Sequence, residues 1–201
     1  MKKYAILFLL LTGCVTTGKS IEVNVNNDFP HNEVQKIAIV TFDTSPKGKG
    51  TTGHILKSVS VGEAKTIFTG IMASELRKWE RFAILEGKAL EEELRSRNLR
   101  EADFLHAKDY SDLGQSLGVD AIVVGEIEKY GFSYITLPAG RLVIMQTSVV
   151  SFKVTCIDVI TNKTIWTINI KGTSGKDIER VLASELITKA IKTLQSKLNQ
   201  K

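Results

Sequence analysis

The first fourteen residues constrain this chain most strongly, because they have the features of a segment that is removed before folding. Two lysines, Lys2 and Lys3, precede an apolar run at Ala5–Leu11, and small residues then lead to Cys14. Positive charge, a short apolar core and small residues, in that order, are the anatomy of a bacterial secretory signal. The seven apolar residues are too few for a membrane-spanning helix, which needs about 20. We therefore expect residues 1–13 to be a signal peptide.

The end of this segment, Leu11-Thr12-Gly13-Cys14, resembles the lipobox of bacterial lipoproteins. The resemblance implies that the Cys14 thiol carries a covalent lipid such as palmitate and that Cys14 becomes the first mature residue. A buried methylene contributes about 0.8 kcal/mol, so two or three acyl chains anchor a protein stably. Val15 replaces the aspartate that would retain a lipoprotein in the inner membrane. The resemblance thus implies an outer-membrane lipoprotein with its domain in the periplasm.

The same region also matches the phosphate-loop pattern GxxxxGK[ST], from Gly13 to Ser20. In a true phosphate loop, Lys19 would meet the phosphates of a nucleotide and Ser20 would reach magnesium, and a helix would follow directly. Here Ile21–Val25 alternates β-branched residues with polar ones, which makes a poor helix. Nucleotide binding is therefore an alternative that the local pattern disfavours.

Composition favours a folded extracytoplasmic domain without nucleic-acid partners. Of 201 residues, 43% are apolar and 24% are charged, fractions typical of globular proteins. The net charge of +5 is a mild surplus, and an address outside the cytoplasm argues independently against nucleic acid. If Cys14 is acylated, Cys156 has no partner for a disulfide. Because it alternates with polar residues in a predicted strand, we expect a buried, unreactive thiol.

Composition shifts and periodicity divide the mature chain. Residues 14–35 are rich in threonine and asparagine and predict a lipidated flexible tether, with a weak alternation at Ile21–Val25 that is compatible with an edge strand. A buried strand follows at Lys36–Asp43. The next loop holds three lysines, either a contact for an acidic partner or, as we favour, a solvated connection. They are Lys47, Lys49 and Lys57.

Periodic segments then predict an α/β domain over residues 36–201. Helices are expected at residues 60–80, 88–99 and 109–117, with Gly118 as the C-cap of the third. Strands are expected at residues 82–85 and 121–127, followed by a β-meander at residues 131–172, in which Val150, Phe152 and Val154 alternate with polar residues and Asn162-Lys163 forms a tight turn. Asp177 opens a long amphipathic helix. Its predicted apolar side comprises Ile178, Val181, Leu182, Leu186, Ala190, Leu194 and Leu198. This order predicts a mixed β-sheet flanked by helices, in a two- or three-layer sandwich.

Three stretches together resemble the superfamily that contains the curli-secretion CsgG lipoproteins, the LpoB activators of peptidoglycan synthases and the TolB amino-terminal domain. They are Lys36–Asp43 with its following loop, Leu117–Ile127, and the strand–turn–strand Val154–Ile170 before the final helix. The resemblance covers residues 36–198. It implies a non-enzymatic domain that binds other envelope proteins or assembles into rings of its own copies.

An oligomeric CsgG-like secretion channel is the alternative within this resemblance. Pore-forming members extend two hairpins across the membrane, and residues 129–148 supply one, with its turn at Pro138–Gly140. A second hairpin should follow the strand of Trp166. Because Lys171–Gly175 leads directly into the last helix, the sequence disfavours the channel.

No catalytic constellation is evident in the sequence. The histidines His31, His54 and His106 are scattered without metal-ligand spacing, and there is no GxSxG motif for a nucleophilic serine. We therefore expect no enzyme activity, no metal, no cofactor beyond the lipid on Cys14 and no small-molecule substrate. The predicted function is a lipid-anchored, protein-binding domain in envelope assembly, secretion or the regulation of a peptidoglycan synthase.

Overall fold

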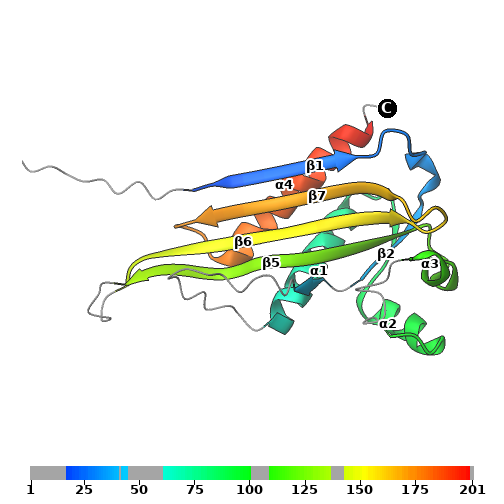
Figure 1. The fold of residues 1–201 in the computed structure, drawn as a ribbon, viewed down its shortest axis with the longest axis horizontal. Coiled ribbons are helices and arrows are strands. Elements are labelled where there is room, and N and C mark those ends of the chain that lie inside the picture. The colour runs from blue at the N-terminus through cyan, green and yellow to red at the C-terminus, as the bar shows by residue number, and fades with distance from the viewer. Residues whose placement is uncertain (1–16, 41, 45–60, 101–108, 137–142, 200–201) are drawn as a thin grey trace, which may run out of the picture.

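Seven strands form one mixed sheet in the computed structural model, which describes residues 17–40, 42–44, 61–100, 109–136 and 143–199 (Figure 1). The strands are β1 (Lys19–Val25), β2 (Lys36–Ile39), β3 (Asp43–Thr44), β4 (Ala83–Leu85), β5 (Ala121–Thr136), β6 (Val143–Asp158) and β7 (Thr164–Ser174). The described helices are the short 3₁₀ turn η1 (His31–Glu33), α1 (Val61–Lys78), α2 (Gly87–Ser96), α3 (Ser111–Leu117) and α4 (Glu179–Asn199).

The strand order is β1-β7-β6-β5-β2-β4, and the short strand β3 also pairs with β5. Strands β1, β7, β6 and β5 are antiparallel neighbours, whereas β2 runs parallel to both β5 and β4. The parallel part comes from the early alternation of helices and strands, and the antiparallel part from the later meander. The predicted fold class, a mixed sheet flanked by helices with a long C-terminal helix, is confirmed.

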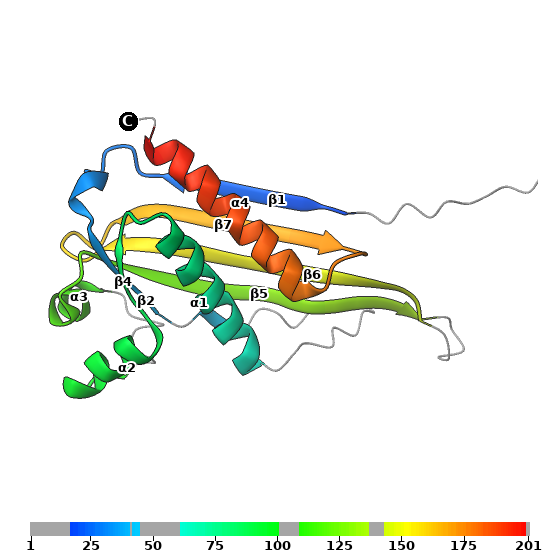
Figure 2. The same ribbon diagram turned by 180° about the vertical axis from the view of Figure 1, so that it is seen from behind.

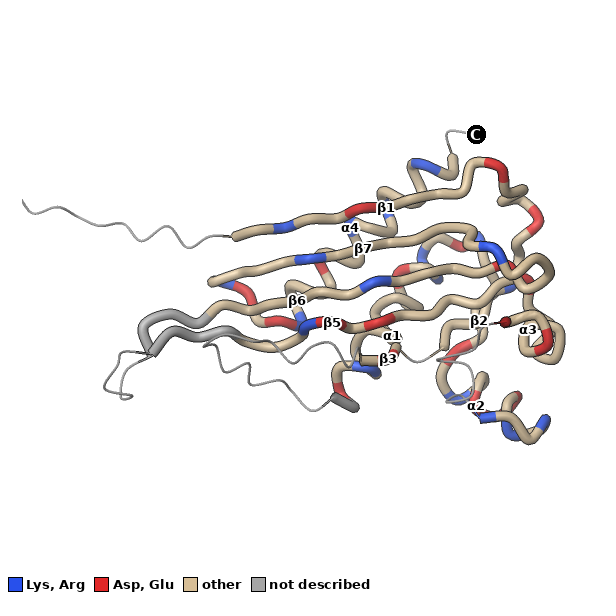
Figure 3. Tube along the Cα trace, viewed as in Figure 1, with Lys and Arg blue, Asp and Glu red and all other residues tan. Residues whose placement is uncertain are grey.

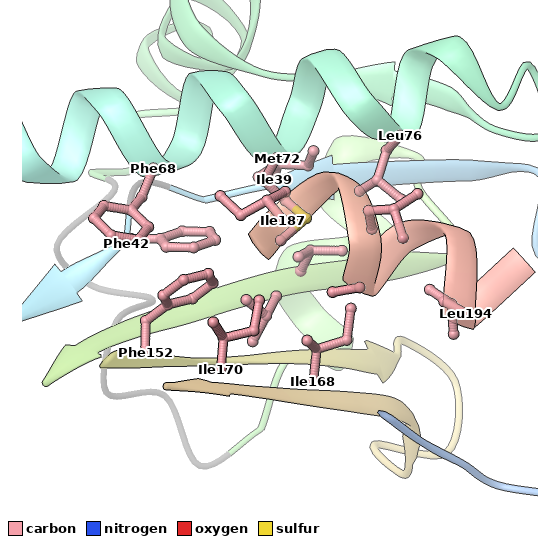
Figure 4. Close-up of a cluster of buried hydrophobic side chains, with 14 of the residues drawn as sticks. Ile39, Phe42, Phe68, Met72, Leu76, Phe152, Ile168, Ile170, Ile187 and Leu194 are labelled. Atoms are coloured by element: carbon pink, nitrogen blue, oxygen red, sulfur yellow. The ribbon is translucent and has the colours of Figure 1, made fainter. Parts of the chain in front are cut away.

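The main core lies between the sheet and the helices α1 and α4, which cross the same face (Figure 2). Apolar residues of α1 recur at helical spacing and meet the inward side chains of β6 and β7 (Figure 4). Phe68, Met72 and Leu76 from α1 and Leu186 and Leu194 from α4 are fully buried. Burying such a side chain contributes about 1.5–3 kcal/mol. The core therefore fixes both helices on the sheet.

Two glycines in the strands make room for this core. A Cβ atom on Gly125 would lie 2.3 Å from the ring of Phe42, and one on Gly172 would lie 2.5 Å from Cδ1 of Leu186. Real Cβ atoms do not approach other atoms so closely. The absence of a side chain on Gly172 thus lets Leu186 of α4 rest directly on β7.

A smaller core on the opposite face packs α2 and α3 against β2 and β5. Ala38 and Ile122 point to this side of the sheet and meet Leu90 of α2 and Leu113 of α3. The predicted C-cap of the third helix is confirmed, because Gly118 has the left-handed φ of 60° that ends α3. Within the described part of the chain, helices therefore cover this face beside β2 and β5 alone.

The predicted tether, residues 14–35, is wrong from Lys19 onward. Residues 19–25 pair along their whole length with β7 as the edge strand β1, as their alternation allowed. Val23 and Val34 are buried with 4% and 5% of their surface exposed. The apolar positions of β1 face α4, and their burial outweighs the weak strand signal of the asparagines. Residues 14–16 lie outside the described residues.

The hairpin predicted at residues 129–148 exists as a strand pair. Strands β5 and β6 remain paired as far as Thr136 and Val143, while the turn at Pro138–Gly140 lies outside the described residues. Strand β7 ends at Ser174 and α4 begins at Glu179, so a second hairpin has no room there, as expected. None of the described helices combines the length and apolar character that crossing a bilayer requires.

Candidate protein-binding surface

Most residues singled out from the sequence fall outside the described part of the chain. These are Cys14, the lysines Lys47, Lys49 and Lys57, and the histidines His54 and His106. His31 is described: its Nε2 lies 2.8 Å from the carbonyl oxygen of Asn26, and its ring meets that of Phe29 edge-on at 5.5 Å. These contacts give His31 a structural role in the turn after β1.

The Cys156 thiol is buried, as predicted, with 1% of its surface exposed. Burial and the nearby Asp158 carboxylate raise its pKa well above the usual range of a thiol. A thiol that stays protonated is a poor nucleophile and metal ligand. Within the described segments, no three His, Cys, Asp or Glu side chains gather as a metal-binding group would require.

The end of the phosphate-loop match lies in a strand. Lys19 and Ser20 begin β1, and the Lys19 ammonium pairs with Glu185 of α4 at 2.6 Å. A phosphate loop needs a helix after it, so that the helix N-terminus faces the phosphates. The segment after Ser20 is extended instead. The extended backbone at this position therefore also disfavours a phosphate loop.

Charged residues recur along the long strands (Figure 3), and the strand positions that alternate with the core residues, and so face away from α1 and α4, are mostly polar. A cross-strand row runs from Glu22 through Asn169 and Lys153 to Glu126. Charges of opposite sign are neighbours in this row and partly neutralise each other. The lowered pKa of Glu22 fits this pattern, since Asn24 and Asn169 donate hydrogen bonds to its carboxylate. This face has the character of a solvated surface.

A different surface lies where α1 and α4 begin. An open groove of about 470 Å³ separates the two helix starts above β5. Its lining is mostly apolar and consists of Glu63, Thr66, Ile67, Tyr130, Ile178, Glu179 and Arg180. A mostly apolar concave surface with a few polar groups is the usual form of a binding site.

Two apolar side chains at the start of α4 are exposed, although periodicity placed them on the buried side of the last helix. Ile178 is 58% exposed and Val181 is 50% exposed. The prediction is wrong at these two positions because α4 crosses the sheet obliquely (Figure 2), and at its start no described element covers this part of the helix. Of the two, Ile178 lines the groove, and an exposed apolar side chain in a groove is typical of an interaction site.

Hydrogen bonds hold the start of α4 in place. The Ser174 hydroxyl donates to Oδ2 of Asp177 at 2.7 Å and accepts from the backbone N–H of Asp177 at 3.1 Å. The Ser148 hydroxyl of β6 donates to the Asp177 carbonyl oxygen at 2.6 Å. The following residue, Ile178, is therefore displayed by a fixed turn.

The groove also contains a buried carboxylate oxygen without a hydrogen-bond partner. Glu179 is 8% exposed, and its Oε2 has no hydrogen-bond partner within the described structure. Burial raises the pKa of Tyr130 to about 12, and the Glu179 and Glu63 carboxylates add to this effect, against an opposing contribution of Arg180. An unpaired buried carboxylate is costly. The groove thus offers an apolar surface and an unsatisfied acceptor.

Sequence reasoning missed Tyr130 and Glu179 because neither belongs to a motif. One signal was present: at Ile178, Val181 and Leu182 the apolar side of the last helix is wider than the single stripe that packing on one sheet requires. Such excess apolar width at one end of a helix indicates a second contact.

A family model described as "Putative lipoprotein GNA1162-like" matches residues 80–201, more than half of the chain. The chain belongs to the GNA1162-like lipoprotein family. Membership confirms the lipoprotein class predicted from Cys14, while the broader resemblance to CsgG, LpoB and TolB stays a prediction. No curated protein matches the sequence.

Solved structures share the fold of this lipoprotein at low sequence identity. A PelC dodecamer from Paraburkholderia phytofirmans matches with a TM-score of 0.52 and 16% identity, over 87% of this chain and 95% of PelC. Lipoprotein GNA1162 from Neisseria meningitidis matches with a TM-score of 0.50 and 17% identity, over 81% of this chain and 99% of GNA1162. At such identities these matches establish the fold alone.

Proposed function

We propose that this GNA1162-like lipoprotein is a non-enzymatic envelope protein, anchored through lipid on Cys14 and binding proteins, including its own copies, through the groove between α1 and α4. The anchor rests on the lipobox and on family membership. Outer-membrane placement rests on Val15 alone. The domain then faces the periplasm and acts in envelope assembly, secretion or regulation of a wall-building enzyme.

One observation carries the proposal of protein binding. The groove joins the exposed apolar side chain of Ile178 to the unpartnered Oε2 of Glu179 on a fixed helix start. Exposing the apolar atoms of this groove to water does not stabilise the folded domain, because burying them would stabilise it more. At an interface the same groups supply an apolar centre and a specific polar contact.

Self-association is the form of binding that the comparisons favour. The PelC structures of the same fold are dodecamers. Copies held on one membrane surface also meet at a high effective concentration, so a modest contact is enough to assemble them. We therefore propose other copies of this chain as the first partner.

A secretion channel is the second candidate function. The observation in its favour is that β5 and β6 each have 16 residues, more than the 9–11 that a membrane-crossing strand needs. Conductance of planar bilayers after addition of the purified oligomer would support this function. Absence of conductance from an oligomer that is intact by light scattering would remove it.

The anchor is tested by metabolic labelling with palmitate. We expect wild-type chain to incorporate label and the Cys14→Ser variant to lose it. Label that persists in Cys14→Ser, or fails to enter the wild type, would contradict the lipid anchor.

The binding surface is tested on the lipidated chain in phospholipid vesicles, by amine cross-linking followed by denaturing gels. We expect Ile178→Asp to convert oligomers to monomers, because a charge in the apolar lining of the groove must be desolvated. Thr193→Asp, which places the same charge at an exposed position near the other end of α4, is the matched control and should assemble normally. Equal oligomer sizes for both variants would refute the groove as the assembly surface.

A further inference from the structure

The turn between β6 and β7, residues 159–163, carries the most exposed large apolar side chain of the described residues. Ile160 is 82% exposed, and Lys163, three positions later, is also exposed. The sequence predicted a tight turn at Asn162-Lys163, whereas the connection spans five residues, from Val159 to Lys163. The longer turn projects Ile160 beyond the sheet.

Buried polar contacts make this turn rigid. Oδ2 of Asp158 accepts hydrogen bonds from the Thr161 backbone N–H at 2.7 Å and from the Thr161 hydroxyl at 2.6 Å. The side chain of Val159 is buried in the smaller core, and its N–H donates to the carbonyl oxygen of Asp120 at 3.0 Å. Asn162 adopts a left-handed φ of 54° that closes the turn. Little conformational entropy is therefore lost when Ile160 enters a contact.

The turn and the groove are chemically complementary. The groove needs an apolar side chain against Ile67 and Ile178 and a donor for the Glu179 carboxylate. The turn presents a branched apolar side chain and, close to it, a lysine ammonium with three N–H donors. Two carboxylates, on Glu63 and Glu179, and one cation, Arg180, line the groove, so its balance of charge favours a cation.

We propose that the groove binds the β6–β7 turn of a second copy, with Ile160 in the apolar part and the Lys163 ammonium at the Glu179 and Glu63 carboxylates. This inference rests on the proposed function and names the segment that occupies the groove. A second copy satisfies the orphaned Oε2 of Glu179 and covers the exposed Ile160 and Ile178 in one contact.

The positions of the two surfaces determine the type of assembly. The turn lies at one end of the long strands, and the start of α4 lies toward the other end (Figure 2). Different surfaces meet in this contact, so each bound pair retains a free turn and a free groove. Such a heterologous contact propagates into a closed ring or a filament and does not stop at a dimer.

The contact is small, which places assembly at the membrane. A turn seated in a groove of about 470 Å³ buries less than the roughly 1,000 Å² that a stable interface in solution needs. A lipid anchor confines the copies to a surface and raises their effective concentration. The full lipidated chain in phosphatidylethanolamine and phosphatidylglycerol vesicles is therefore the material for the test.

The test combines amine cross-linking in these vesicles with denaturing gels. We expect the wild type to give a ladder of dimers, trimers and larger species. Ile160→Asp and Ile178→Asp alone should each lower the oligomers at least about tenfold, since each removes a central apolar anchor. Both positions are exposed, and unchanged thermal unfolding midpoints would show that the domain remains folded.

Mixing the two variants tests the head-to-tail geometry. An Ile178→Asp copy keeps an intact turn and an Ile160→Asp copy keeps an intact groove, so the mixture should regain dimers and stop there. Failure of the mixture to regain dimers overturns the inference.

The lysine contact is tested with a matched pair of variants that each lose one amine. Lys163→Glu should reduce the ladder as strongly as Ile160→Asp. Lys153 is exposed on the polar sheet face, so Lys153→Glu should leave the ladder intact. Equal ladders for both overturn the assigned role of Lys163.

The remaining outcomes separate the two proposals. If Ile178→Asp removes the ladder and Ile160→Asp does not, another segment occupies the groove; the inference fails and the proposed binding surface stands. If Ile160→Asp removes the ladder and Ile178→Asp does not, the turn binds elsewhere and the inference fails. If neither variant changes the ladder, the groove is not the assembly surface and both proposals fail.

Discussion

The two ends of α4 follow one amphipathic pattern and meet opposite environments. Toward the C-terminus, Leu186 and Leu194 are completely buried against the sheet and α1. At the start of the helix, Ile178 and Val181 keep half or more of their surface exposed, beside the buried and unpartnered Oε2 of Glu179. The first set stabilises the domain by burial. The second set contributes little to folding and is available for a partner.

This difference shows how one helix can serve both the stability of the domain and the proposed binding. The C-terminal part fixes the position of α4 through the core, and hydrogen bonds from Ser148 and Ser174 fix its beginning. The exposed side chains are therefore held in place without being covered. A preorganised apolar surface loses little entropy when it binds.

The largest expected effect tests the difference between the buried and the exposed end of α4. Leu186→Ala should lower the free energy of unfolding by about 2–5 kcal/mol, because it leaves a cavity in the main core. Val181→Ala should change it by no more than about 0.5 kcal/mol, because that side chain is half exposed. Urea titration followed by circular dichroism measures both. Similar losses for the two variants would break the comparison.

A smaller loss is expected from adding atoms beneath the buried part of α4. In Gly172→Ala the new methyl group meets Cδ1 of Leu186 at 2.5 Å unless the helix moves. Such overpacking costs about 1–3 kcal/mol. Gly70→Ala in α1, where a Cβ meets nothing within 4 Å, is the control and should be neutral or stabilising. If Gly172→Ala is as stable as the wild type, α4 can shift to accommodate the new methyl group without loss of stability.

The smallest effect concerns the ion pairs on the exposed side of α4. Hydrogen bonds from Lys189 and Lys19 lower the pKa of Glu185 to about 2. A lowered pKa in the folded state stabilises the domain above the usual carboxyl pKa, and this contribution is lost as pH falls from about 4.5 toward 2. Solvent screens the pairs, so Glu185→Gln should cost only about 0.2–1 kcal/mol at pH 7.

Urea titrations of Glu185→Gln at pH 7 and pH 3 measure this dependence. The difference from wild type should shrink at the lower pH, where Glu185 begins to be protonated. Lys189→Gln and Lys19→Gln separate the pair within α4 from the pair that links it to β1. A difference that grows as the pH falls would have the wrong sign for this explanation.

Much of the fold could be predicted because its signals are local. Alternation at Val150, Phe152 and Val154 predicted the central strand, and Gly118 predicted the end of α3, since both depend on neighbouring residues alone. The edge strand β1 was harder to predict. Its residues resemble a tether, and their place in the sheet depends on β7 and α4, which are more than 140 positions away in the sequence.

The candidate surface could not be predicted in the same way. Tyr130 and Glu179 lie about fifty positions apart and meet only because β5 and α4 cross. No motif includes either residue. The apolar excess at Ile178 and Val181 was visible, but periodicity shows which side of a helix is apolar and not whether a neighbour covers it.

The sequence by itself determined the lipoprotein class of this chain, the alternation of its strands and the apolar stripe of its last helix, because each is written in consecutive residues. Only the tertiary structure decided which part of that stripe is buried and which part forms a groove with an unpaired carboxylate. The physical reason is that burial depends on the elements that pack against a residue, and those elements come together only in the folded domain.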